Sequence, residues 1–231
     1  MRPAVLALVL LSILGCHDSD VRVIPAMVNW MEWPAQVPAK TAFPVRLRGY
    51  NASCAYTVGF VPSPKVDQSA VTFEPYFLSN GRPAVCDAIV FVVVDGKRTP
   101  VANQFAASYF DTTTMTPGLA SDFPRTYEMR ASAYVYNVYT ATATGLPVRT
   151  FGEITVGSSA NGRLNAGGFT GATRGTDGCM RLTPAGLFPG YVLENPPDTT
   201  SYWSAFVKGY LYAPAAPVCG ESTVFHLLSR N

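Results

Sequence analysis

Few side chains of this chain have the type and spacing that acid–base or nucleophilic chemistry requires. The two histidines are His17 and His226, and only His226 lies within the part expected to fold. A hydrolase would need a nucleophile beside such a base, and no nucleophile motif accompanies His226. We expect a hydrogen-bonded histidine on a strand, and we predict no catalytic residue.

Paired carboxylates offer a second route to hydrolysis, as in glycosidases. The second half of the chain holds four candidates: Glu153, Glu194, Asp198 and Glu221. Their spacing cannot place any two of them face to face, so solvated surface is the simpler interpretation. An enzyme that uses these carboxylates or His226 remains an alternative hypothesis.

An aromatic surface is predicted near the C-terminus. If residues 207–212 form a strand, Lys208, Tyr210 and Tyr212 share one face, and the smaller or apolar residues between them take the other. Two phenol rings beside an ammonium can stack on a sugar ring or hydrogen-bond with a peptide. These three residues are the predicted binding surface. Tyrosines that only cover a small barrel are the alternative.

The cysteines predict disulfides. Four of the five follow Cys16, and an even number in an exported protein is typical of disulfide pairing. A wide gap separates a front pair from a rear pair, so we predict Cys54–Cys86 and Cys179–Cys219. No two cysteines lie within four residues of each other, a spacing that disfavours zinc. No metal or cofactor is expected.

The N-terminus has the organisation of an export signal. Arg2 precedes an apolar run at 4–14, and a polar segment follows at 17–20. At about 1.5 Å per residue, a run of roughly 11 residues is too short to cross about 30 Å of hydrocarbon. Residues 1–15 are therefore predicted to be a cleaved targeting segment.

Ile13-Leu14-Gly15-Cys16 resembles the lipobox of bacterial lipoproteins. The resemblance implies a diacylglyceryl group on the Cys16 thiol and cleavage after Gly15, which leaves 16–21 as a lipidated tether. In that family a residue other than aspartate after the cysteine, here His17, implies outer-membrane sorting in a Gram-negative cell. The expected location is the cell envelope, on the periplasmic face or the surface of the outer membrane. An ordinary secretory signal that contains a cysteine is the alternative.

Composition limits the partners. Charged residues make up 14% of the chain, with 17 basic against 15 acidic, so no large field exists to attract polyanions, and nucleic acid is not expected. Apart from the lipid anchor, a partner would be an envelope protein or glycan. The oligomeric state stays open.

Strand patterns in the first half predict a β domain over 22–142 that resembles an immunoglobulin-like sandwich. Pro44 indicates that the first of these strands lies at a sheet edge or bulge. The third is an unbroken apolar run that enters a hairpin at 95–96. The expected strands are 43–48, 71–77, 88–94 and 127–140.

The second half, 143–231, has the element order of an OB-fold: three strands, a short helix and two strands. We therefore predict an OB-like barrel. The helix would begin at Asp198 and carry Tyr202, Trp203 and Phe206. Turns are expected at Asn161-Gly162 and Gly167-Gly168, and the strands at 151–156, 179–182, 191–194, 207–212 and 223–228.

The fold classes predicted here favour a binding function by analogy, since sandwich and OB-like scaffolds often bind partners through loops and strand faces. The leading hypothesis is a lipid-anchored, non-catalytic binding or assembly module for an envelope protein or glycan. A hydrolase and a purely structural lipoprotein are the alternatives.

Overall fold

The structure is a computed structural model, and its regular elements are all strands. It describes residues 21–51, 57–79, 89–94, 97–102, 108–120, 125–132, 147–158, 162–184, 190–197 and 201–231. Within these residues the predicted mainly β fold is confirmed. The first strands are β1 (Arg22–Pro25), β2 (Met27–Pro34), β3 (Gln36–Val37), β4 (Phe43–Asn51), β5 (Thr57–Val61), β6 (Pro64–Val66), β7 (Ala70–Phe73), β8 (Tyr76–Ser79) and β9 (Ile89–Val94). The others are β10 (Lys97–Ala102), β11 (Ser108–Thr116), β12 (Arg125–Ser132), β13 (Val148–Val156), β14 (Leu164–Arg174), β15 (Met180–Pro184), β16 (Tyr191–Leu193), β17 (Tyr202–Tyr212) and β18 (Val224–Arg230).

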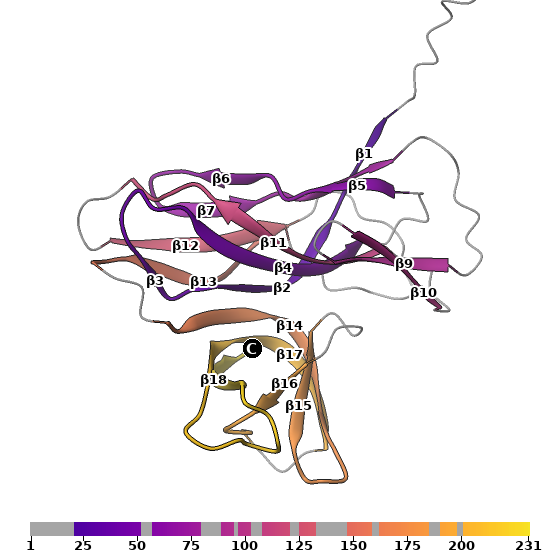
Figure 1. Cartoon of the computed structure of the whole chain (residues 1–231), viewed down its shortest axis with the longest axis vertical. Coiled ribbons are helices and arrows are strands. Elements are labelled where there is room, and N and C mark those ends of the chain that lie inside the picture. The colour runs from indigo at the N-terminus through magenta and orange to yellow at the C-terminus, as the bar shows by residue number, and fades with distance from the viewer. Residues whose placement is uncertain are drawn as a thin grey trace, which may run out of the picture.

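A β-sandwich occupies the upper part of the molecule in Figure 1. One layer has the strand order β10-β9-β11-β4-β2, and the other has the order β3-β13-β12-β7-β6. A small third sheet, β1-β8-β5, lies at one end. Apolar side chains from both layers fill a shared core, among them Met31, Leu47, Phe73, Met129 and Phe151. Burial of this core is the main stabilising contribution to the sandwich.

The first predicted strand is confirmed as β4, but it is not an edge strand. Its alternate residues Phe43, Val45 and Leu47 are buried, as the period of two requires. The strand lies between β11 and β2. Its pairing with β2 extends only to Arg46, so Pro44 has a single neighbouring strand, β11.

The other three strands predicted in the first half agree with the structure to different extents. The segment 71–77 is two strands, β7 and β8, in different sheets, separated at Glu74 and Pro75. The apolar run is β9, which lies between β11 and its antiparallel partner β10, as predicted. The strand at 127–140 is β12 as far as Ser132. The remainder of that segment and the expected boundary at 142–143 lie outside the described residues.

A closed five-stranded barrel forms the lower part of the molecule (Figure 1). Its order is β14-β15-β16-β18-β17, and β17 pairs back with β14 to close the ring. Neighbours are antiparallel except for β16 and β18, which are parallel. The barrel core contains Leu182, Val207 and Phe225, together with Trp30 from the sandwich strand β2. This is the OB-like strand arrangement expected from the element order.

The first barrel strand is β14 and not 151–156. That segment belongs to β13, which pairs with β12, and Phe151, Ile154 and Val156 lie in the sandwich core. The predicted helix is wrong as well, because Tyr202, Trp203 and Phe206 are residues of β17. Alternation shows that one face of a strand is buried, but it does not show which sheet covers it.

Gly167 and Gly168 are not a turn; they lie inside β14, where the two cores meet. β14 pairs with β2 over residues 164–168 and with β15 over residues 170–174. Gly168 has φ of +152°, and a Cβ there would lie 1.9 Å from the carbonyl oxygen of Asn29. Only glycine fits this close approach. One continuous sheet therefore runs from the sandwich into the barrel.

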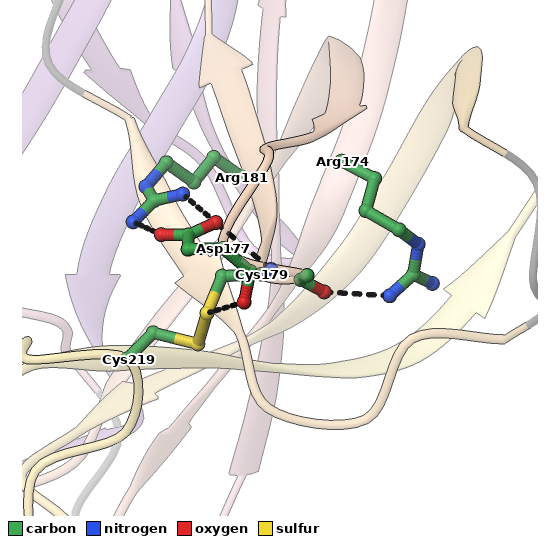
Figure 2. Close-up of a disulfide and its surroundings, with 6 residues drawn as sticks. Arg174, Asp177, Cys179, Arg181 and Cys219 are labelled. Atoms are coloured by element: carbon green, nitrogen blue, oxygen red, sulfur yellow. Dashed lines mark hydrogen bonds and ion pairs between the residues drawn. A yellow bond between two sulfur atoms is a disulfide. The ribbon is translucent and has the colours of Figure 1, made fainter.

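The disulfide Cys179–Cys219 is confirmed, with the two Cα atoms 6.1 Å apart. It joins the turn between β14 and β15 to the segment before β18 (Figure 2). The turn is also held by Asp177, whose carboxylate accepts hydrogen bonds from the Arg181 guanidinium and the Cys179 N–H. Cys16, Cys54, Cys86 and the whole segment 1–20 lie outside the described residues, so their predicted roles stay predictions.

Within the described part of the chain, no helix is long and apolar enough to cross a bilayer.

Candidate functional site

The predicted binding surface lies on the outer face of β17. Val207 and Leu211 point into the barrel core, whereas Lys208, Tyr210 and Tyr212 are half-buried on the opposite face. The alternation expected for 207–212 is therefore present.

The sandwich covers only the first part of this outer face. Phe206 packs edge-to-face on Phe151 of β13, with ring centroids 5.5 Å apart, and the Arg149 guanidinium lies over the Phe206 ring. Tyr210 and Tyr212 lie beyond this contact and line an open depression. The interface between sandwich and barrel thus ends before the two tyrosines.

A carboxylate from another strand completes the group. Glu194 follows β16, and its N–H donates to the carbonyl oxygen of Phe225 on the parallel neighbour β18. This backbone bond brings the Glu194 side chain beside β18 and β17. The Tyr212 hydroxyl donates to Glu194 Oε1, and His226 Nδ1 lies 2.7 Å from Glu194 Oε2. The Glu194 and His226 side chains remain 32% and 31% exposed.

Tyr210 connects these groups to a basic side chain. Its ring stacks on the His226 imidazole, with centroids 4.9 Å apart and planes 21° from parallel, because the two residues are paired in register. The Arg163 guanidinium carbon lies 4.2 Å from the Tyr210 ring centroid, a cation–π distance. The Tyr210 ring already contacts His226, Arg163 and the Tyr212 ring, so a ligand would meet mainly polar groups here.

The protonation states follow from these contacts. Hydrogen bonds from the Tyr212 hydroxyl and then from His226 hold the pKa of Glu194 below its ordinary value. The same bond to Glu194 raises the pKa of Tyr212 to about 12. At neutral pH the site therefore presents an ionised carboxylate beside a protonated phenol.

The lining residues form an open depression of about 500 Å³, within the range of small-ligand sites. We call this group the open cluster; its members are Arg163, Glu194, Tyr210, Tyr212 and His226. A second depression, of about 270 Å³, adjoins it and shares Arg163. Lys208 lines the second depression and not the first.

The side chains of the open cluster are equipped for hydrogen bonding. Among the described residues that line the depression, none is a serine, threonine or cysteine beside the His226–Glu194 pair. Among the described residues no group of three or more potential metal ligands is found. What the cluster offers is a fixed set of donors and acceptors on an exposed surface.

In the structure, two residues of the predicted binding surface lie beside two residues that the sequence suggested only as candidates for catalysis. Tyr210 and Tyr212 belong to the predicted surface, whereas Glu194 and His226 were considered only for catalysis. Arg163 was missed, because it precedes β14 and no motif marks it. Of the other acids, Glu153 lines the second depression and Glu221 lies near Arg181, while Asp198 is outside the described residues.

A second polar group, largely buried between the sandwich and the barrel, starts with two arginines on β4, of which Arg46 is partly exposed. Arg46 makes two 2.6 Å hydrogen bonds to the Asp111 carboxylate. Arg48 donates to the same carboxylate at 3.1 Å and lies 3.6 Å from Glu32. Glu32, Arg48 and Asp111 are all buried. These charges are stable inside the protein only because they neutralise one another.

The barrel contributes a tyrosine to this buried group. The Tyr191 hydroxyl of β16 donates to Glu32 at 2.5 Å, and Trp30 Nε1 donates to the same carboxylate at 2.8 Å. Burial, followed by the charge of Glu32, raises the pKa of Tyr191. We call Glu32, Arg46, Arg48, Asp111 and Tyr191 the buried cluster. Because the buried cluster joins β16 of the barrel to strands of the sandwich, it holds the two parts together.

Comparison of the chain with protein-family models, curated proteins and solved structures found no match. The function must therefore be argued from the chemistry of the site itself.

Proposed function

We propose that this protein is a lipid-anchored module of the cell envelope whose barrel binds a glycan without catalysis. The observation that carries the proposal is the open cluster, in which Glu194, Tyr212 and His226 are hydrogen-bonded to one another in an open depression. The lipobox resemblance around Cys16 supports the envelope location.

The donor and acceptor pattern favours a ligand rich in hydroxyl groups. An ionised carboxylate accepts hydrogen bonds from hydroxyls, and a guanidinium and an imidazole donate to their oxygen atoms. Stacking of Tyr210 on His226 and the bonds to Glu194 fix these groups before binding, which lowers the entropic cost of recognition. A stable protein partner would instead bury roughly 800 Å² per side around an apolar core.

Two variants test the proposal by glycan-array binding of the full chain, purified in mild detergent. Tyr212→Phe removes a charge-assisted hydrogen bond, and Glu194→Gln removes the charge that strengthens it; we expect each to weaken binding by at least about tenfold. Tyr202→Phe is the matched control, since Tyr202 lies on the same strand but is 64% exposed and outside the depression. It should bind like the wild type.

Other outcomes would contradict this function. Capture of an envelope protein in a Tyr212-dependent manner, with no glycan bound, would replace the glycan by a protein partner. Turnover of a substrate that is lost in His226→Gln would establish the enzyme alternative.

For the anchor, mass spectrometry of the mature N-terminal peptide should show diacylglyceryl-modified Cys16; an unmodified peptide that begins beyond Cys16 would refute it.

A further inference from the structure

The second depression extends the open cluster toward the sandwich. Residues of β13, β14, β17 and β18 line it, and Arg163 lines both depressions. Lys208 and Tyr212 share the outer face of β17 and lie four residues apart, about 13 Å along an extended strand. The two depressions together are therefore longer than one sugar ring.

Lys208 is the side chain that distinguishes the second depression. Its ammonium makes no hydrogen bond or ion pair within the part of the chain that the structure describes. The acid it influences is Glu128, whose pKa is lowered first by a hydrogen bond from Arg130, next by Thr150, and least by Lys208. The Arg130–Glu128 contact is a 2.7 Å ion pair, so Glu128 already has a cationic partner.

The remaining wall does not cancel this charge. Among the described lining residues Glu153 is the one carboxylate, and its side chain is exposed to solvent. Its backbone carbonyl, by contrast, points inward and accepts hydrogen bonds from Trp33 and Asn165. Two cations, Arg163 and Lys208, therefore face one solvated acid in this depression.

We propose that the two depressions form one groove for an acidic oligosaccharide. This inference rests on the proposed glycan-binding function and names the class of glycan. Ring hydroxyls bind the Glu194–Tyr212–His226 group, and an anionic substituent of a neighbouring sugar lies between Lys208 and Arg163. Ammonium and guanidinium groups form charge-assisted hydrogen bonds with carboxylate and phosphate oxygens alike.

Calorimetry with matched pairs of oligosaccharides tests this groove on the full chain in mild detergent. The carboxylate pairs are hexamers of galacturonate, mannuronate and glucuronate, each with its neutral methyl ester; the phosphate pair is a phosphorylated oligomannose with its dephosphorylated form. At low salt we expect the acidic member of at least one pair to bind about fivefold or more tightly than the neutral member. The preferred pair identifies the anion, and salt should reduce the preference.

Lys208→Gln provides the decisive variant. It should reduce the preference to less than about twofold while the affinity for the neutral member stays within about twofold of wild type, because the open cluster is intact. Lys65→Gln is the control, since Lys65 is an exposed lysine on the sandwich strand β6, paired with Glu74.

The possible failures are distinguishable. Equal affinities for acidic and neutral members, with binding still lost in Tyr212→Phe, overturn the acidic groove and leave the proposed function standing. A preference that survives Lys208→Gln also overturns the groove. If no member of any pair binds, the proposed function and the groove both fall.

Discussion

Two barrel tyrosines among the described residues each donate to a carboxylate, and the two pairs differ mainly in their surroundings. Tyr191 donates to Glu32, and Tyr212 donates to Glu194. The first pair is sealed between the barrel and the sheet, where the Glu32 side chain is 6% exposed; the second lines an open depression, where the Glu194 side chain is 32% exposed. The same chemical pair can thus hold two layers together or remain accessible to a ligand.

Burial changes the energetic consequence of each contact. In the buried cluster, removal of one partner leaves a buried charge only partly compensated, as at Arg48, which would keep Glu32 at 3.6 Å, and this is destabilising. In the open cluster, solvent replaces a lost partner at little cost. We therefore expect mutations in the buried cluster to change stability and mutations in the open cluster to change binding.

The largest effect is expected for Asp111→Ala. Asp111 neutralises Arg46 and Arg48, and Arg48 is buried. Its loss should lower the free energy of unfolding by about 3 to 5 kcal/mol, measured by urea denaturation. Glu194→Ala, the matched change in the open cluster, should cost less than about 1 kcal/mol. Comparable losses in the two variants would remove the distinction between the clusters.

A somewhat smaller loss of stability is expected when the disulfide at the turn between β14 and β15 is removed, at the end of the barrel that lies away from the sandwich in Figure 1. The Cys179–Cys219 bridge closes a loop with a sequence separation of 40 residues. In the chain-entropy model, replacing both cysteines by serine should lower the free energy of unfolding by about 3 to 4 kcal/mol. A loss below about 1 kcal/mol would mean that the buried cluster and the barrel core suffice to maintain the barrel.

The smallest effect is a shift in titration. The pKa of Tyr212 is raised to about 12 by its bond to Glu194, so the phenol should lose its proton above the ordinary tyrosine range near 10. Its contribution to stability is present below about pH 10 and is lost as the pH rises through about 12. The ultraviolet difference titration between wild type and Tyr212→Phe measures this midpoint. In Glu194→Gln the midpoint should move back toward 10; an unchanged midpoint would mean that Glu194 does not hold the phenol.

The sequence predicted those features that depend on local alternation. The face formed by Lys208, Tyr210 and Tyr212 follows from the period of a strand, and the rear disulfide follows from cysteine spacing. Glu194 could not be placed beside Tyr212, because that contact depends on the parallel pairing of β16 with β18, and nothing in the local sequence encodes it.

The errors arose where a local pattern has more than one structural use. Gly167-Gly168 is typical of a turn, but here it permits the close approach of β14 to Asn29. The segment 202–206 follows an expected N-cap, yet it is part of β17, and exposed, buried and exposed residues follow one another at 202–204. In both cases a neighbouring strand, remote in sequence, determined the conformation.

One paired measurement tests the distinction between the clusters most directly: the stability and the glycan affinity of Tyr191→Phe and Tyr212→Phe. Tyr191→Phe deprives a buried carboxylate of a donor, so it should lower the free energy of unfolding by about 1 to 3 kcal/mol and leave affinity unchanged. Tyr212→Phe should leave the free energy of unfolding nearly unchanged and weaken affinity by at least about tenfold. If Tyr212→Phe instead lowers stability while affinity is unaffected, the open cluster is a structural contact and the account is contradicted.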